Sequence, residues 1–155
     1  MFAFILTTKD HQVFYESRIN RDVFTPGGGC YIMNHRVLIV GMNPSTRERV
    51  FKNSTFDRML RWMDLLSVDY FSFMNAYDLP GPVNGQVPNR DALIAAAERH
   101  RKVVALGGVA ADALRKCGVE FFRMPHPSPK NRQLNSKEYE LEMIEKCERY
   151  LNDPL

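Results

Sequence analysis

The stretch Val37-Leu-Ile-Val-Gly41 decides the fold, because it is a short, continuous apolar run that ends in glycine. Such a run is typical of a strand that is buried on both faces, as the strands of a parallel sheet are. Gly41 would let the backbone turn sharply after the strand and would let a ligand come close to it. The run therefore predicts the first core strand of an α/β domain.

Three more segments downstream have strand character, and helical segments separate them. The predicted strands are 37–41, 70–74, 102–106 and 119–123, and the predicted helices begin near Asn53, at Arg90, at Gly107 and at Ser136. Strands that alternate with helices predict a parallel sheet covered on both faces. We therefore expect one domain over residues 1–155: a three-layer α/β/α fold with a central, mainly parallel four-stranded sheet.

The first 36 residues are harder to interpret. Residues 2–7 have the composition of a strand, whereas residues 12–24 mix polar and apolar side chains without a clear period. No secondary structure is predicted for the second of these segments.

Composition narrows the class of protein. The chain has 155 residues, of which 45% are hydrophobic and 25% charged, as in an ordinary soluble domain. No apolar run approaches the roughly 18 residues that a membrane span needs. The net charge of +3 neither requires nor excludes a nucleic-acid partner, so that question depends on where the charges lie.

Cysteine and histidine usage gives no sign of a metal centre or of a disulfide framework. The three cysteines, Cys30, Cys117 and Cys147, are widely spaced, and the four histidines form no H-x-x-x-H or H-E-x-x-H pair. We expect reduced thiols in a cytoplasmic protein, with no metal and no cofactor.

The ligands of such sheets bind outside the carboxyl ends of the strands. Gly41-Met-Asn-Pro-Ser45 follows the first core strand, and Pro44 would bias Asn43 away from helix. An amide there can hold a water molecule or a base edge, but it is no strong general base. The plainer interpretation is an ordinary strand-to-loop turn.

Met124-Pro-His-Pro-Ser-Pro129 follows the fourth predicted strand, and its prolines indicate a rigid loop. His126 on such a loop could donate a hydrogen bond or stabilise charge near neutral pH. A solvated or structural histidine is the alternative.

Other side chains near this edge could contact a nucleic acid. Asn75 ends the second strand and could pair with a base edge or simply cap a turn. Phe51 could stack on a base, whereas Phe56 is expected on the core side of its helix. Basic residues after the His-Pro loop could meet phosphates, or they could form a solvated face; they are Lys130, Arg132 and Lys137.

Together, these segments resemble the uracil-DNA glycosylase superfamily over roughly residues 37 to 137. The motifs that carry the resemblance are Gly41-Met-Asn-Pro and His126-Pro-Ser-Pro-Lys-Asn131. They are most similar to those of the single-strand-selective monofunctional branch. Ser45-Thr46 stands where that branch usually has Gly-Pro. The Asn43-Pro-Ser-Thr46 run also resembles a group of small uncharacterised bacterial and phage proteins in the superfamily.

The resemblance implies a role for each matching residue. Asn43 matches the residue that orients the attacking water, and His126 matches the one that stabilises the departing uracil anion. Gly41, Met42, Phe51 and Asn75 would bind the base, with Phe51 stacking on it and Asn75 reading its edge. The implied DNA contacts are Ser45, Ser128, Lys130, Asn131 and Arg132, and Arg132, Gln133 and Leu134 are candidates for a wedge.

We expect a monofunctional DNA glycosylase that hydrolyses the N-glycosidic bond of uracil or a related modified pyrimidine. It would act in base excision on single-stranded DNA or a flipped-out base, as a monomer encoded by a bacterium or phage. One alternative is a non-catalytic DNA-binding module on the same fold. Another is an enzyme that acts on a modified nucleobase or nucleotide.

Overall fold

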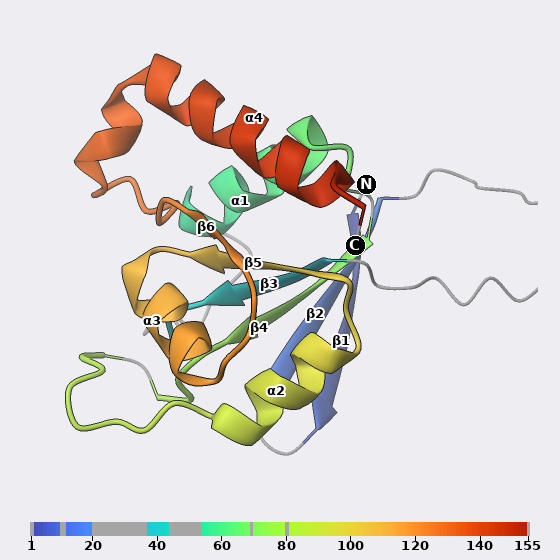
Figure 1. Ribbon diagram of the computed structural model, residues 1–155, viewed down its shortest axis with the longest axis vertical. Helices are drawn as coiled ribbons and strands as arrows, with labels where there is room; N and C mark the ends of the chain where they lie inside the picture. Colours follow the sequence, from blue (N-terminus) through green and yellow to red (C-terminus); the bar gives the residue numbers. More distant parts are fainter. Residues whose placement is uncertain are drawn as a thin grey trace, which may run out of the picture.

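A computed structural model describes residues 2–9, 12–19, 37–43, 54–68, 70–79 and 81–154 (Figure 1). It confirms the predicted α/β class. One sheet of six strands has the order β1-β2-β4-β3-β5-β6. The strands are β1 (Phe2–Lys9), β2 (Gln12–Ile19), β3 (Val37–Gly41), β4 (Tyr70–Asn75), β5 (Lys102–Leu106) and β6 (Phe122–Met124). The helices are α1 (Ser54–Leu65), α2 (Arg90–Glu98), α3 (Gly108–Lys116), the short 3₁₀ helix η2 (Arg132–Asn135) and α4 (Lys137–Asn152).

The four predicted strands form the parallel part of the sheet. β3 pairs with β4 on one side and with β5 on the other, and β6 pairs with β5. After β3 the chain first adds β4 on one side, and then crosses over to add β5 and β6 on the other side. A topological switch point therefore lies next to β3. In such sheets the ligand crevice opens at the carboxyl ends of the strands beside the switch point. This rule directs attention to the residues just after β3 and its neighbours.

A hairpin of two antiparallel strands lies beside the four parallel strands, so the sheet has six strands among the described residues. The strand predicted at residues 2–7 is confirmed as β1, which runs to Lys9. The second strand, β2, was not predicted; it pairs antiparallel with both β1 and β4. Its sequence, QVFYESRI, lacks a clean apolar alternation, so its strand conformation depends on the partners that the fold supplies.

Two apolar clusters show the three layers. Val37 and Ile39 pack in one cluster with residues of α1 and α4. Leu38 and Val40 pack in the other, with residues of α2 and α3. The helices α1 and α4 thus cover one face of the sheet, and α2 and α3 cover the opposite face (Figure 1). β3 is therefore buried on both faces, which explains its unbroken apolar sequence.

The helix and strand limits differ slightly from those predicted. α2 ends at Glu98 rather than near His100, and β6 runs over Phe122–Met124 instead of the predicted 119–123. The strand begins later because the Val119 N–H still donates to the Leu114 carbonyl of α3, at 3.1 Å. The predicted stop at Gly118 is confirmed, with a positive φ of 69°.

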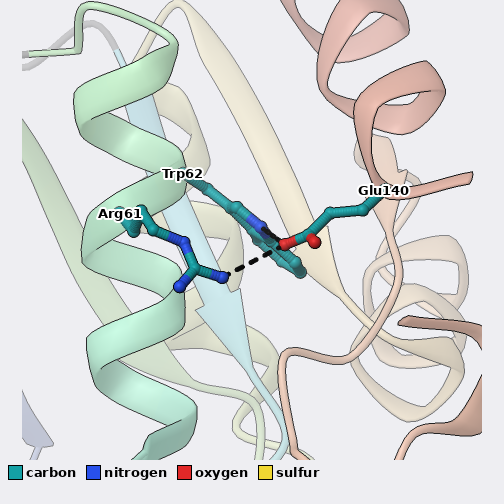
Figure 2. Close-up of polar contacts among 3 residues, drawn as sticks. All are labelled: Arg61, Trp62 and Glu140. Carbon is teal, nitrogen blue, oxygen red and sulfur yellow. Dashed lines mark hydrogen bonds and ion pairs between the residues drawn. The ribbon is translucent and has the colours of Figure 1, made fainter. Parts of the chain in front are cut away.

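Both helices on one face of the sheet are joined by a side-chain contact. The Trp62 indole of α1 donates a hydrogen bond of 2.7 Å to the Glu140 carboxylate of α4, and Arg61 lies 3.4 Å from the same oxygen (Figure 2). Trp62 is fully buried, so its N–H needs this acceptor. The contact fixes the start of α4, which directly follows η2 and the His126 loop.

Two of the three cysteines lie within the described residues, and neither forms a disulfide there. Cys117 and Cys147 are free thiols, and Cys30 lies outside the described residues. Burial raises the pKa of the Cys147 thiol to about 12, which makes it a structural rather than a reactive group. None of the described helices is long and apolar enough to cross a membrane.

Candidate functional site

Gly41 and Asn75 lie opposite each other at the carboxyl ends of β3 and β4. A Cβ atom on Gly41 would lie 2.8 Å from the Asn75 Oδ1, so the Asn75 amide lies directly over the glycine. No other residue would leave room for it. Asn75 is half-buried, and no hydrogen bond of its side chain is found within the described ranges. The amide is thus placed at the sheet edge, as the sequence predicted.

The backbone continues this pairing beyond the ends of the strands. The Ala76 N–H donates to the Gly41 carbonyl at 2.9 Å, and the Tyr77 N–H donates to the Met42 carbonyl at 3.0 Å. These bonds hold residues 42 and 43 against the segment that follows β4. Met42 therefore stabilises the edge of the site through its backbone carbonyl.

Asn43 is held by the loop between β4 and α2. Its Nδ2 donates to the Leu79 carbonyl at 3.1 Å and also to the Gly81 carbonyl. Two carbonyl oxygens at one end of the amide fix its orientation, because only the NH₂ group can face them. The Oδ1 is left as a hydrogen-bond acceptor. Asn43 can therefore accept a hydrogen bond from water, as a water-orienting residue would.

The His126 loop is fixed by its own short-range hydrogen bonds. The Asn131 Nδ2 donates to the His126 carbonyl at 3.0 Å, and the Asn131 Oδ1 accepts from the Gln133 N–H at 3.1 Å. The Ser128 hydroxyl accepts from the Lys130 N–H at 3.2 Å. Asn131 and Ser128 thus act inside the protein as loop-stabilising groups, a role that does not exclude the predicted contact with DNA.

The local environment favours a neutral His126 ring with its hydrogen on Nε2. The Ser128 N–H donates to Nδ1 at 3.1 Å, so Nδ1 is the acceptor and Nε2 carries the hydrogen. Burial lowers the pKa of His126 below its usual 6.5, because the charged form would lose hydration. The ring is therefore a neutral hydrogen-bond donor through Nε2.

Gly107, which follows β5, makes room for this ring. A Cβ atom on Gly107 would lie 3.0 Å from the His126 Cβ and 3.3 Å from its Cδ2. The residue also has a φ of 89°, which side chains other than glycine rarely adopt. The His126 ring is thus packed over the end of β5.

These placements bring the predicted residues to one edge. Asn75 ends β4, Asn43 follows the neighbouring strand β3, and His126 lies over the end of β5, the next strand. The three residues therefore lie at the carboxyl ends of three adjacent parallel strands.

A cavity of about 400 Å³ opens beside His126. Its polar side chains are Arg123, His126, Asn131, Gln133 and Tyr139, and Gly107, Gly108, Pro125 and Met143 complete it. The Arg123 guanidinium packs over Gly108, where an added Cβ atom would be 3.0 Å from a guanidinium nitrogen. None of the described residues that line this cavity carries a carboxylate. Arg123 was not singled out from the sequence, although its place between the inward-facing Phe122 and Met124 marks it as outward-facing.

The other predicted residues divide into three groups. Lys130, Arg132 and Lys137 are exposed beside the His126 loop. Ser45 and Phe51 lie outside the described residues. Leu134 packs in the core and is excluded as a wedge, which leaves Arg132 and Gln133.

An aromatic pair, Phe56 and Phe73, lies near Gly41, and only Phe56 could be singled out from the sequence. Phe56 is buried as expected, and its ring meets Phe73 edge to face, with 6.0 Å between ring centroids. Phe73 is half-buried, and its ring edge lies 2.8 Å from where a Cβ atom on Gly41 would be. Its spacing of two residues from Asn75 on one strand is the signal that could have identified it, because such residues share a face.

Metal ligation has no support among the described side chains, which contain no group of three or more histidine, cysteine or acidic residues that could hold an ion. Comparisons with family models, with curated proteins and with solved structures found no match. The resemblance to the uracil-DNA glycosylase superfamily therefore rests on the sequence motifs.

Proposed function

We propose that the chain is a monofunctional DNA glycosylase that removes uracil or a related modified pyrimidine. The observation that carries the proposal is the pairing of a neutral donor with a fixed acceptor at one sheet edge. His126, over the end of β5, offers Nε2–H, and Asn43, just after the neighbouring strand β3, offers Oδ1. Together with the sequence motifs, this arrangement favours glycosidic hydrolysis over the other reactions considered.

The charges that develop in the reaction match these two groups. When the bond between C1′ of the sugar and N1 of the base breaks, its electron pair goes to the base and positive charge develops on the sugar. The His126 Nε2–H would stabilise the anionic base oxygen as a donor that is already in place. Asn43 would hold the water whose oxygen bonds to C1′, and the water's proton leaves to the base or to solvent.

Recognition of the base would fall to Asn75 and the aromatic pair. An amide offers both a donor and an acceptor, which matches the adjacent N3–H and carbonyl groups of uracil. Phe73 lies next to Asn75 on the same face of β4 and could cover the base. Phe51 stays a second candidate for stacking.

DNA is the proposed partner, through the surface around the His126 loop. Arg123 lines the cavity beside His126, and Lys130, Arg132 and Lys137 are exposed nearby. Their charges would meet phosphates and so favour a polynucleotide over a free base. A protein of this kind would act as a monomer in the cytoplasm of a bacterium or a phage-infected cell.

The test is incubation with oligonucleotides that contain one uracil, single- and double-stranded, followed by alkali. The proposal expects cleavage at the uracil position, above that of a heat-killed control and of a thymine-containing strand. If neither strand is cut while DNA binding is retained, the uracil assignment fails.

A second function, DNA binding without catalysis, is favoured by one feature of the site. Asn43 is an amide with its NH₂ group engaged, so the position provides no general base. Replacing Asn43 and His126 by Ala distinguishes the two functions. An enzyme loses turnover and keeps most of its DNA affinity, whereas a pure binder has no turnover in the unaltered protein.

A further inference from the structure

The loop between β4 and α2 is built around one glutamine. The Gln86 Nε2 donates to the Pro82 carbonyl at 2.9 Å and to the Leu79 carbonyl at 3.4 Å. The Gln86 N–H also closes a turn by donating to the Val83 carbonyl at 2.9 Å. One side chain therefore ties the two ends of the segment 79–86 together.

The same segment supplies the acceptors for Asn43. The Leu79 carbonyl accepts from both Gln86 and Asn43, and the Gly81 carbonyl also accepts from Asn43. These bonds join positions that are 36 and 38 residues apart in the chain. The direction in which the Asn43 amide points therefore depends on backbone carbonyls of the loop between β4 and α2.

We propose that Gln86 is a positioning residue, which orients the Asn43 amide by holding the carbonyls of Leu79 and Gly81 in place. This inference rests on the proposed function, in which the Asn43 Oδ1 holds the attacking water. If the loop relaxes, the two carbonyls separate from Nδ2, and the amide is free to turn its Oδ1 away from the water.

The arrangement also explains why position 43 holds an amide. A carboxylate at position 43 would place an anionic oxygen against the two carbonyl oxygens, where neither can donate a hydrogen bond. A hydrogen-bond donor is therefore needed at this end of the side chain. Gln86 helps to keep the two carbonyls in the positions that require it.

The test compares three single variants in the full chain. Gln86→Met keeps the length of the side chain and removes its donors, whereas Gln86→Lys keeps a donor of similar reach. Val87→Ala is the matched control, because Val87 is the next residue of the loop and is 85% exposed. The measurements are the single-turnover rate on a uracil-containing single strand and the Kd for the same strand.

The proposal expects Gln86→Met to lower the single-turnover rate about tenfold or more, because small misplacements of a reacting group have effects of this size. The Kd should change less than about twofold, Gln86→Lys should restore most of the rate, and Val87→Ala should match the unaltered protein. In the Asn43→Ala background, Gln86→Met should have no further effect on the rate. Equal losses in both backgrounds, or a changed Kd with an unchanged rate, would overturn the proposal.

A readout without turnover keeps this inference separate from the proposed function. In ¹⁵N-labelled protein, the Asn43 side-chain NH₂ protons should exchange slowly with water, and Gln86→Met should speed that exchange while Val87→Ala does not. Slow exchange that Gln86→Met leaves unaltered would contradict the positioning role, even if the protein excises no uracil. Absence of excision together with the expected exchange would instead contradict only the proposed function.

Discussion

The two halves of the candidate site are held in different ways. His126 is fixed by its own segment, since its ring and carbonyl bond to Ser128 and Asn131, two and five residues away. Asn43 is fixed by the Leu79–Gly81 backbone, which is 36 to 38 residues away in the chain. A local loop keeps its geometry wherever the sheet places it, whereas Asn43 is oriented only once the fold has brought β3 and the β4–α2 loop together.

This difference predicts that the Asn43 half depends on contacts from the distant β4–α2 loop, whereas the His126 half depends on its own loop and on Gly107, over which its ring packs. Four measurements on the His126 half test this difference.

The largest effect is expected from His126→Ala. It removes the donor that would stabilise the departing base, and loss of one such donor typically lowers the rate by about 10² to 10³-fold. The single-turnover rate on a uracil-containing strand should fall by that amount, with the Kd for DNA little changed. A loss below about threefold would show that the departing base is stabilised elsewhere.

A smaller loss is expected from Gly107→Ala, and Gly118→Ala is its matched control. Both glycines have positive φ, 89° and 69°, so each substitution strains the backbone by about 1 kcal/mol. Only Gly107 has His126 within contact distance; an added Cβ atom on Gly118 would meet nothing within 4 Å.

Both variants should therefore lower the Tm, but only Gly107→Ala should also lower the excision rate, by about ten- to a hundredfold. Equal rates in the two variants would contradict the packing of the His126 ring over Gly107. Thermal unfolding followed by circular dichroism, together with the excision assay, measures both effects.

Asn131→Ala should have a still smaller effect. It removes one bond to the His126 carbonyl and one to the Gln133 N–H, while the Ser128 N–H still fixes the ring tautomer. We expect a loss of stability of about 1 kcal/mol, measured by denaturant unfolding, and a rate loss of only a few-fold. An unchanged stability would show that the loop is held by its prolines alone.

The smallest effect is expected on mild acidification. Because burial lowers the pKa of His126 below 6.5, most of the rings stay neutral as the pH falls from about 7.5 to 6.5, and the excision rate should fall less than about twofold. The unfolded chain takes up this proton first, so the stability that the neutral ring contributes is present above pH 6.5 and is lost as the pH falls further. An NMR titration that gives His126 a pKa above 6.5 would contradict this account.

The same comparison explains what the sequence could predict. The four parallel strands could be predicted from apolar or aromatic-rich segments and from the helices between them. The His126 loop could be predicted from its prolines and short-range polar residues. The orientation of Asn43, the role of Gln86 and the contact of Phe73 with Gly41 depend on residues far apart in the chain. β2 could not be predicted for the same reason, because its partners make it a strand.

Arg123 illustrates a different limit. Its position in the chain marks it as outward-facing, but the cavity that it lines forms only where β6, α3, η2 and α4 meet. A basic residue on a strand does not indicate a binding site until the residues around it are known. The sequence motifs therefore identify the centre of the site better than its surroundings.

The central claim is that this edge of the sheet hydrolyses a glycosidic bond. The most direct measurement is mass spectrometry of the products from a single-stranded oligonucleotide with one uracil, before any treatment with alkali. We predict one free uracil for each strand converted, an unbroken abasic strand, and neither product from the Asn43→Ala, His126→Ala double variant. Failure of the unaltered protein to release uracil, or equal release by the double variant, would contradict the account.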